Sequence, residues 1–170
     1  MRSAPEPIGQ PTMPQRPDHF DLIELIFFAY RDFTGGPDAL LEKDGFGRAH
    51  HRVLHFVGRK PGLNVAELLA ILGITKQSLA RVLKDLIEQG HVIQAAGKAD
   101  RRQRQLYLTE RGASLAARLA APQSHRISRA LAELDEGGAE TVRHFLTAML
   151  DEDNQQTFMA LQSFAPDTGE

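Results

Sequence analysis

Two short amphipathic helical patterns, joined by a turn of two residues, constrain the fold of this chain more than any other feature. The first pattern begins at Asn64 and Glu67, which are spaced as a capping box, and its apolar residues recur at helical spacing. Only Gly73-Ile74 separates it from a second helix, which Thr75 can cap. A turn this short is typical of a helix-turn-helix. The inward apolar stripe of the second helix comprises Leu79, Val82, Leu83 and Leu86.

Two extended runs follow the pair of helices, at residues 91–94 and 103–108. The polar residues between the runs predict a hairpin. A further helix is predicted over residues 48–59, so the order across residues 48–111 is that of a winged helix-turn-helix. We therefore expect a mainly α fold with a small β-wing.

An N-terminal helix is predicted over residues 20–33, which are apolar on nearly every side. Asp18 is suited to cap this helix, and the run Gly35-Gly36-Pro37 is expected to stop it. A helix this apolar is buried all round or packs against another chain.

Two more helices are predicted after the second extended run. Thr109 caps a helical segment that reaches about Leu134, and Pro122 should kink or divide that segment. Gly137-Gly138 separates it from a last helix over residues 139–164. The apolar stripe of the last helix comprises Val142, Phe145, Leu146, Met149 and Leu150.

The formal net charge of -2 conceals a basic centre. Residues 1–45 carry a net charge of -4, residues 46–111 one of +7, and residues 112–170 one of -5. This distribution indicates an anion-binding module between two acidic ends. Chance clustering of solvated charges is the alternative.

The second helix of the helix-turn-helix carries side chains that suit the major groove of DNA. With its apolar stripe turned inward, its outer face presents Lys76, Gln77, Arg81 and Lys84. Gln can pair bidentately with adenine and Arg with guanine, whereas Thr75, Ser78 and Lys84 suit phosphates. A solvated helix face with no partner is the alternative interpretation.

The hairpin tip is also basic and holds Lys98, Arg101, Arg102 and Arg104. Such a wing can reach the flanking minor groove or the DNA backbone. We expect Asp100 to orient a neighbouring arginine, because a lone carboxylate near phosphates is unfavourable. A hairpin that charge merely keeps soluble is the alternative. Together, the helix and the wing predict binding to double-stranded DNA.

At this point the sequence resembles the MarR family of transcriptional regulators, over about residues 18–165. The wing residues Asp100 and Arg102 match the D-x-R motif of that family, and Leu108-Thr109 with Gly112 matches its L-T-x-x-G motif. Residues 73–86 match its recognition-helix pattern. The resemblance implies that Arg102 contacts DNA with Asp100 as its partner, and that the first and last helices form a homodimer.

Two further stretches, residues 30–33 and 46–56, look closest to a PetP-like alphaproteobacterial subgroup of the family. The resemblance also implies a ligand cleft between the dimer helices and the DNA-binding lobe. A small-molecule effector bound there would shift the population between DNA-competent and incompetent spacings of the two lobes.

The terminal helices argue for a dimer independently of the resemblance. A helix of about 25 residues is ~38 Å long, which exceeds the width of a small winged helix. The apolar residues that need cover are Leu22, Ile26, Phe27, Phe28, Phe145, Met149, Phe158 and Leu161. Two copies packed together cover them and predict an inverted-repeat DNA site with half-sites about 10 bp apart. A monomer that folds these helices onto itself is the alternative.

Five segments are expected along the chain. They are a disordered tail over 1–17, an N-terminal dimerisation helix and linker over 18–45, a winged helix DNA-binding domain over 46–111, C-terminal dimerisation helices over 112–165, and a tail over 166–170.

Histidines of the helix over residues 48–59 are the candidates for a sensor site. His51 and His55 lie four residues apart, a spacing that can clamp one metal ion or a haem edge. No third ligand is marked, so local hydrogen bonding is the simpler interpretation and no cofactor is expected. Arg31, His51 and His55 could equally line a pocket for an organic anion.

Other function classes have less support. The absence of cysteine excludes disulfides, thiolate zinc sites and a cysteine nucleophile. No phosphate-binding glycine loop, nucleophile elbow or H-E-x-x-H motif indicates an enzyme. No apolar run could span a membrane and residues 1–17 lack a secretory h-region, so we expect a cytoplasmic protein. The alternatives are a haem- or metal-responsive sensor that uses His51 and His55, and a winged helix used only for protein contacts.

Overall fold

The computed structural model of the chain describes residues 16–97 and 103–164 and comprises two compact units. The first unit ends at Asp32 and the second begins at Phe33. Helix α1 (Phe20–Leu41) contributes residues to both units. Within the first unit, the guanidinium carbon of Arg31 lies 4.9 Å from the centroid of the Phe28 ring. The exposed apolar residues of this unit are Leu22, Ile23, Leu25, Ile26, Phe27, Phe28 and Tyr30.

The prediction that Gly35-Gly36-Pro37 stops the first helix was wrong, because α1 continues to Leu41 with Pro37 inside it. Proline has no backbone N–H to donate to the carbonyl four residues earlier, which belongs to Phe33. Here the side-chain amide of Gln123 donates to that Phe33 carbonyl, with an N–O distance of 3.4 Å. A tertiary hydrogen bond thus replaces a helical one, and Pro37 is buried.

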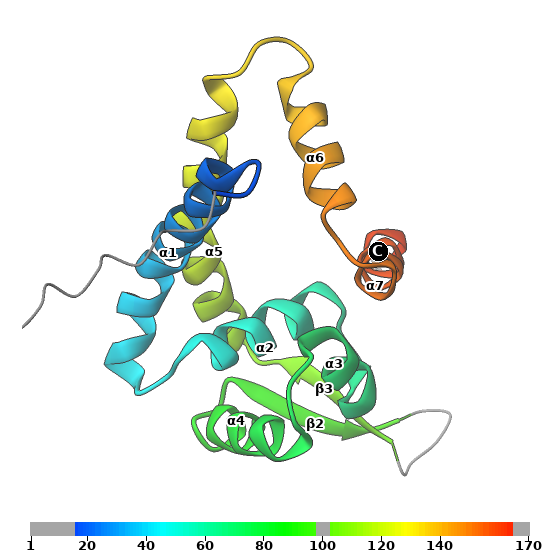
Figure 1. Cartoon of the computed structure of the whole chain (residues 1–170). Coiled ribbons are helices and arrows are strands. Elements are labelled where there is room, and N and C mark those ends of the chain that lie inside the picture. The colour runs from blue at the N-terminus through cyan, green and yellow to red at the C-terminus, as the bar shows by residue number, and fades with distance from the viewer. Residues whose placement is uncertain (1–15, 98–102, 165–170) are drawn as a thin grey trace, which may run out of the picture. The chain divides into compact units, whose positions relative to one another are not determined.

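The second unit contains a winged helix-turn-helix (Figure 1). The structure confirms the predicted fold class, and the boundaries of the helix predicted over residues 48–59 are those observed. The elements are η1 (Glu42–Asp44), α2 (Arg48–Arg59), β1 (Leu63–Asn64), α3 (Val65–Leu72), α4 (Lys76–Glu88), β2 (Val92–Ala96) and β3 (Arg104–Leu108).

The three strands form an antiparallel sheet in the order β1-β3-β2. β2 and β3 are the two predicted strands, with Val92 opposite Leu108 and Ala96 opposite Arg104. β1 was not predicted, because two residues are too short for a periodic pattern. Leu63 of β1 lies opposite Leu106 of β3, so the strand that precedes the helix-turn-helix pairs with a strand of the wing.

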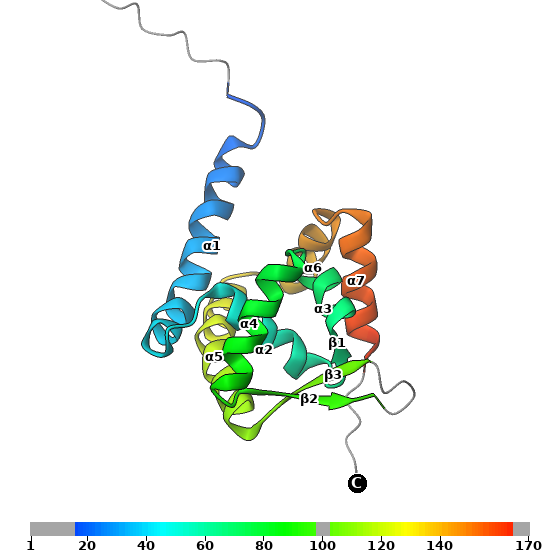
Figure 2. The ribbon, with the colours of Figure 1, turned by 90° about the horizontal axis from the view of Figure 1, so that it is seen from below.

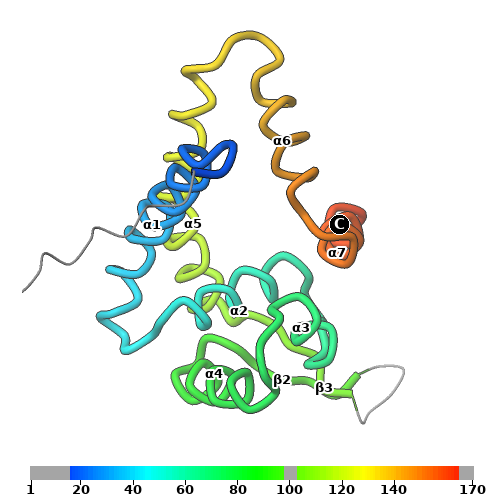
Figure 3. The backbone as a smooth tube through the Cα atoms, viewed as in Figure 1, coloured from blue at the N-terminus to red at the C-terminus, as the bar shows by residue number. Residues whose placement is uncertain are grey.

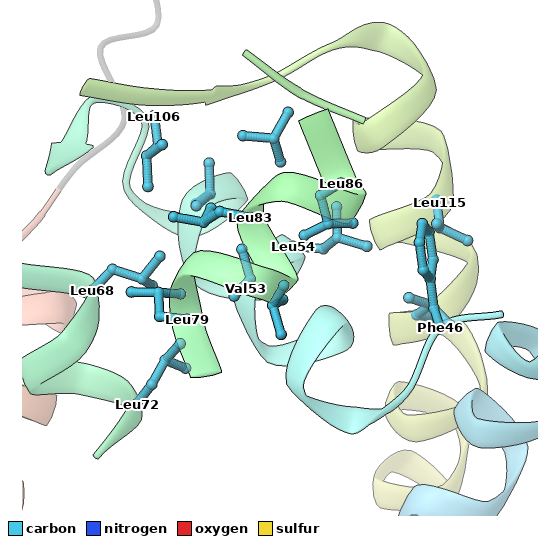
Figure 4. Packing of buried hydrophobic residues seen from close by; sticks show 14 of the residues in the cluster. Phe46, Val53, Leu54, Leu68, Leu72, Leu79, Leu83, Leu86, Leu106 and Leu115 are labelled. Atoms are coloured by element: carbon cyan, nitrogen blue, oxygen red, sulfur yellow. The ribbon is translucent and has the colours of Figure 1, made fainter. Parts of the chain in front are cut away.

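The hydrophobic core lies between α2, α3, α4 and the sheet (Figure 4). The stripe predicted for α4 is buried: Leu79, Val82, Leu83 and Leu86 are all 5% exposed or less. Leu68 and Leu72 of α3, Val53 and Leu54 of α2, and Leu106 of β3 pack in the same cluster. The cluster also includes residues outside the 46–111 segment, namely Leu41, Leu115 and Leu119.

Helix α5 (Glu110–Ala132) runs without a break through Pro122, so of the two predicted effects of this proline, a kink or a division, the division does not occur. Thr109 caps it as predicted, since its hydroxyl accepts from the backbone N–H of Gly112 at 3.0 Å. The ring of Pro122 lies against Gly36, where an added β-carbon would approach Cβ of Pro122 to 3.4 Å. The prolines of both long helices are therefore accommodated by packing between those helices.

The single last helix predicted over residues 139–164 was wrong, because the structure has α6 (Gly138–Ala148) and α7 (Glu152–Ser163). The side chain of Gln155 stabilises the break between α6 and α7. Its side-chain amide donates to the carbonyls of Thr147 and Leu150, both at 3.1 Å, and so satisfies groups left open at the end of α6. The turn of the chain from α6 into α7 can be followed in Figure 3.

Helix α7 lies beside α3 and β1 of the winged helix (Figure 2). The guanidinium of Arg59, at the end of α2, donates to the carbonyls of Leu161 and Phe164 at 2.8 and 2.9 Å. Leu161 is buried, whereas other large apolar residues of α6, its C-cap and α7 are exposed, namely Phe145, Leu146, Met149, Phe158 and Met159. None of the helices within the described ranges is sufficiently long and apolar to cross a lipid bilayer.

Candidate nucleic-acid interface

The α4 outer face is the set of predicted side chains that the helix turns away from the core. All six of them are exposed: Thr75, Lys76, Gln77, Ser78, Arg81 and Lys84. Burial of the opposite stripe fixes which way α4 faces, so the exposure of this set follows from the packing of Leu79, Leu83 and Leu86.

The N-terminus of α4 is held by its own hydroxyl groups. Oγ1 of Thr75 accepts from the backbone N–H of Ser78 at 3.1 Å, and the Thr75 hydroxyl donates to Oγ of Ser78 at 2.9 Å. The preceding turn is stabilised by Gly73, whose φ of +61° lies in the left-handed region. Free backbone N–H groups and the helix dipole at such an N-terminus favour a phosphate.

Lys84 of this face is only weakly paired. Nζ of Lys84 lies 3.8 Å from Oε1 of Glu88, and both side chains are exposed. An exposed pair of this kind contributes little to stability, so Lys84 can exchange it for a phosphate at small cost.

Two open grooves flank α4, and Lys76 lines both. One holds about 450 Å³ and is also lined by Asn64, Val65, Ala66, Leu69, Gln103 and Arg104. The other holds about 320 Å³ and is lined by Val65, Ala80, Leu83, Lys84, Ile87 and Gln94. The structure therefore brings Arg104 of the wing near Lys76 of α4. The other wing residues predicted to act on DNA, Lys98, Asp100, Arg101 and Arg102, lie outside the described residues.

Two polar side chains of α2 contact the helices of the helix-turn-helix. The guanidinium of Arg52 donates to the carbonyl of Leu72 at 2.7 Å, which caps the end of α3. Nε2 of His50 lies 3.2 Å from Oδ2 of Asp85 on α4. The sequence pattern favoured two other histidines of α2, His51 and His55, because helical spacing carries no information on a partner 35 residues away.

The candidate ligand residues fall in different parts of the chain. His51 and His55 lie on α2, whereas Arg31 belongs to the first unit. Burial and the nearby His55 lower the pKa of His51, an effect that Asp38 partly offsets. Burial and the charge of Arg59 likewise lower the pKa of His55. In the part of the chain that the structure describes, no group of three His, Cys, Asp or Glu residues could hold a metal ion.

His91 is a buried polar residue that sequence reasoning missed. Only 2% of it is exposed, and neither ring nitrogen has a hydrogen-bond partner within the described residues. Its ring meets that of Phe46 edge-on, with centroids 5.4 Å apart. Burial lowers the pKa of His91, and the charge of Arg111 lowers it further. A small pocket of about 200 Å³ beside it is lined by Asp44, Arg111, Ser114, Leu115 and Arg118.

The lowered pKa values predict that acid destabilises the protein. The unfolded chain takes up protons at His51, His55 and His91 near a pKa of about 6.5, whereas the folded chain takes them up only at lower pH. The contribution of these groups to stability is therefore complete above about pH 6.5 and is lost as pH falls through the lower, folded values. Urea unfolding should give a smaller free energy of unfolding at about pH 5.5 than at about pH 7.5.

His91→Phe is the control for this prediction. Phenylalanine keeps a ring against Phe46 and removes the titrating nitrogens, so the pH dependence should become shallower. A wild-type stability that stays constant or rises on acidification would contradict the stated direction of the shifts.

Comparison with known proteins agrees with this geometry. Residues 44–103 match the family model described as MarR family. The chain is also 46% identical, over 129 residues, to the HTH-type transcriptional regulator PetP of Rhodobacter capsulatus, in a match that covers 76% of this chain and 78% of PetP. The chain therefore belongs to the MarR family of transcriptional regulators. The expectations of a MarR-family regulator and of a protein that is not an enzyme are both confirmed.

Solved structures share the fold. A MarR protein from Peptoclostridium difficile has a TM-score of 0.69 at 17% identity, covering 90% of this chain and 99% of that one. The crystal structure of Streptococcus pneumoniae FabT in complex with DNA has a TM-score of 0.67 at 16% identity, covering 84% of this chain and 98% of that one. At these identities the likeness concerns the fold alone.

Proposed function

We propose that this MarR-family protein is a cytoplasmic homodimer that binds an inverted repeat in double-stranded DNA and regulates transcription there. The observation that carries the proposal is the α4 outer face, which presents amide, hydroxyl and cationic groups on a helix whose other side is buried. In a helix-turn-helix the second helix is the one that enters the major groove. The FabT structure is a complex with DNA, which supports a DNA-binding role for this fold.

The side chains of this face divide into two roles. Gln77 and Arg81 read base edges, because an amide can pair with adenine and a guanidinium with guanine. Thr75, Lys76, Ser78 and Lys84 contact phosphates and fix the position of the helix. On the wing, Lys98, Arg101, Arg102 and Arg104 reach the minor groove or backbone beside it, and Asp100 orients Arg102.

Exposed apolar residues support the dimer. In the first unit they occur along α1, with Phe27 69% exposed, and in the second they occur on α6 and α7. Apolar surface of this kind on helices usually marks an interaction site. A two-fold dimer presents two copies of α4 to two half-sites, which requires an inverted repeat.

A small-molecule effector is the second part of the proposal. The candidates for contact with it are His51 and His55, because both lie on α2 one helical turn apart and an imidazole can accept or donate a hydrogen bond. We expect these two imidazoles to contact an organic anion. A haem- or metal-responsive site through His51 and His55 is the alternative, and a protein-interaction module is the alternative to DNA binding.

Arg102→Ala tests the assignment of the wing. The variant should bind a duplex selected from random-sequence DNA about tenfold more weakly than the wild-type protein, because one charged contact is lost. Sedimentation should show the same oligomeric state, since the wing is not part of the proposed dimer surface. If the variant dissociates instead, Arg102 is misassigned; unchanged affinity would remove the wing from the interface.

A further inference from the structure

The imidazole of His50 is fixed by three neighbours. Nδ1 accepts from the backbone N–H of Gly47 at 3.1 Å, which caps the start of α2. Because Nδ1 is the acceptor, this pairing assigns the proton to Nε2, which donates to Oδ2 of Asp85 at 3.2 Å. The ring of Phe46 is stacked on it, with centroids 4.6 Å apart and planes at 17°. The ring therefore presents its Nε2 proton toward α4 in one orientation.

Asp85 lies one helical turn after Arg81 on α4. An acid and a base spaced four residues apart on a helix attract each other. Nevertheless, the structure places no ion pair between Arg81 and Asp85, and the carboxylate of Asp85 faces His50 on α2 instead. Arg81 itself is exposed on the α4 outer face.

We propose that His50 is a positioning residue for DNA binding, which holds the carboxylate of Asp85 away from Arg81 and from the DNA phosphates. This inference rests on the proposed role of α4 as the DNA-reading helix. A released Asp85 would pair with Arg81 and compete with DNA for its guanidinium. It would also bring a negative charge toward the phosphates, where like charges repel.

The test needs a substitution that preserves the helix cap. His50→Glu does so, because a glutamate at the third helical position can accept from the backbone N–H of Gly47, as in a capping box. Its carboxylate cannot donate to Asp85 and repels it. Asp85→Ala removes the carboxylate that His50 restrains, and the double variant combines the two changes.

Binding is measured by fluorescence anisotropy at one fixed, low salt concentration. The probes are a duplex selected from random-sequence DNA by the wild-type protein and an unrelated duplex of the same length. His50→Glu should weaken binding to the selected duplex by about tenfold, the effect of one charge-assisted contact. Asp85→Ala alone should change affinity by less than about twofold, because the wild-type carboxylate is already restrained. In the double variant, the loss of Asp85 should restore affinity to within about twofold of wild type.

Glu88→Ala is the matched control, since it removes another carboxylate of α4 that is exposed and has no histidine partner. Glu88→Ala should change the affinity for the selected duplex by the same factor in the wild-type protein and in the His50→Glu variant. A specific effect of Asp85 therefore appears as non-additivity that Glu88 does not show.

Two outcomes separate this inference from the function on which it rests. If Arg81→Ala leaves binding to the selected duplex unchanged, the role of α4 is wrong. If Arg81→Ala weakens binding but Asp85→Ala fails to rescue His50→Glu, only the positioning role is overturned. A loss of thermal stability in His50→Glu with no change in affinity would likewise reduce His50 to a structural residue.

Discussion

Phe27→Asp is expected to convert the proposed dimer into a monomer and to abolish DNA binding at low protein concentration. Phe27 is 69% exposed on α1, and its neighbours on the helix are exposed and apolar as well. Burial of a phenylalanine contributes about 2 kcal/mol, and a two-fold interface contains the residue twice. The dimer dissociation constant should therefore rise by about a thousandfold or more, since each 1.4 kcal/mol is about tenfold.

Ile93→Asp is the matched control for this substitution. Ile93 is also a large exposed apolar residue, but it lies on β2 of the winged helix. Sedimentation should find Ile93→Asp dimeric and Phe27→Asp monomeric, with equal helix content by circular dichroism. A Phe27→Asp protein that sediments as the wild type does would show that α1 is not covered by a second copy.

Gly112→Ala, at the start of α5, should be strongly destabilising although it adds only one methyl group. A β-carbon at Gly112 would clash with the backbone carbonyl oxygen of His91 and would approach its carbonyl carbon to 2.9 Å. That carbonyl accepts from the backbone N–H of Thr109 at 3.1 Å, so it cannot move without loss of a hydrogen bond. We expect a loss of about 3 kcal/mol, or about 10 °C in melting temperature.

Gly35→Ala is the control for the backbone effect. Nothing lies within 4 Å of a β-carbon at Gly35, which is inside α1. Alanine is favoured over glycine in a helix interior by about 1 kcal/mol, so this variant should melt slightly higher than the wild-type protein. Equal melting temperatures for Gly112→Ala and the wild type would show that α5 does not pack on the His91 carbonyl as described.

The elements that the sequence predicted well are those with local causes. The capping box of Asn64 and Glu67, the Thr75 and Thr109 caps and the inward stripe of α4 all depend on residues within one or two turns. Hydrogen bonds from Asn64 and Lys60 even lower the pKa of Glu67, although burial acts in the opposite direction. For this reason the winged helix and the α4 outer face were accessible from periodicity and capping.

The elements that it predicted wrongly depend on tertiary contacts. Pro37 and Pro122 remain inside helices because Gln123 supplies a hydrogen bond and Gly36 makes room for a ring. The break between α6 and α7 is held by the side chain of Gln155. His50 and His91 likewise gain their significance from Asp85 and Phe46, which periodicity could not bring beside them.

The proposed function requires two copies of this chain to read a DNA sequence through α4 and the wing. Its most direct test is a titration of the wild-type protein against its selected duplex and a scrambled duplex, over a series of salt concentrations. We expect two chains per selected duplex and a preference of about a thousandfold over the scrambled one. We also expect a steep fall in affinity with salt, from several phosphate contacts in each subunit. Equal affinity for both duplexes, or binding that is insensitive to salt, would contradict the proposed function.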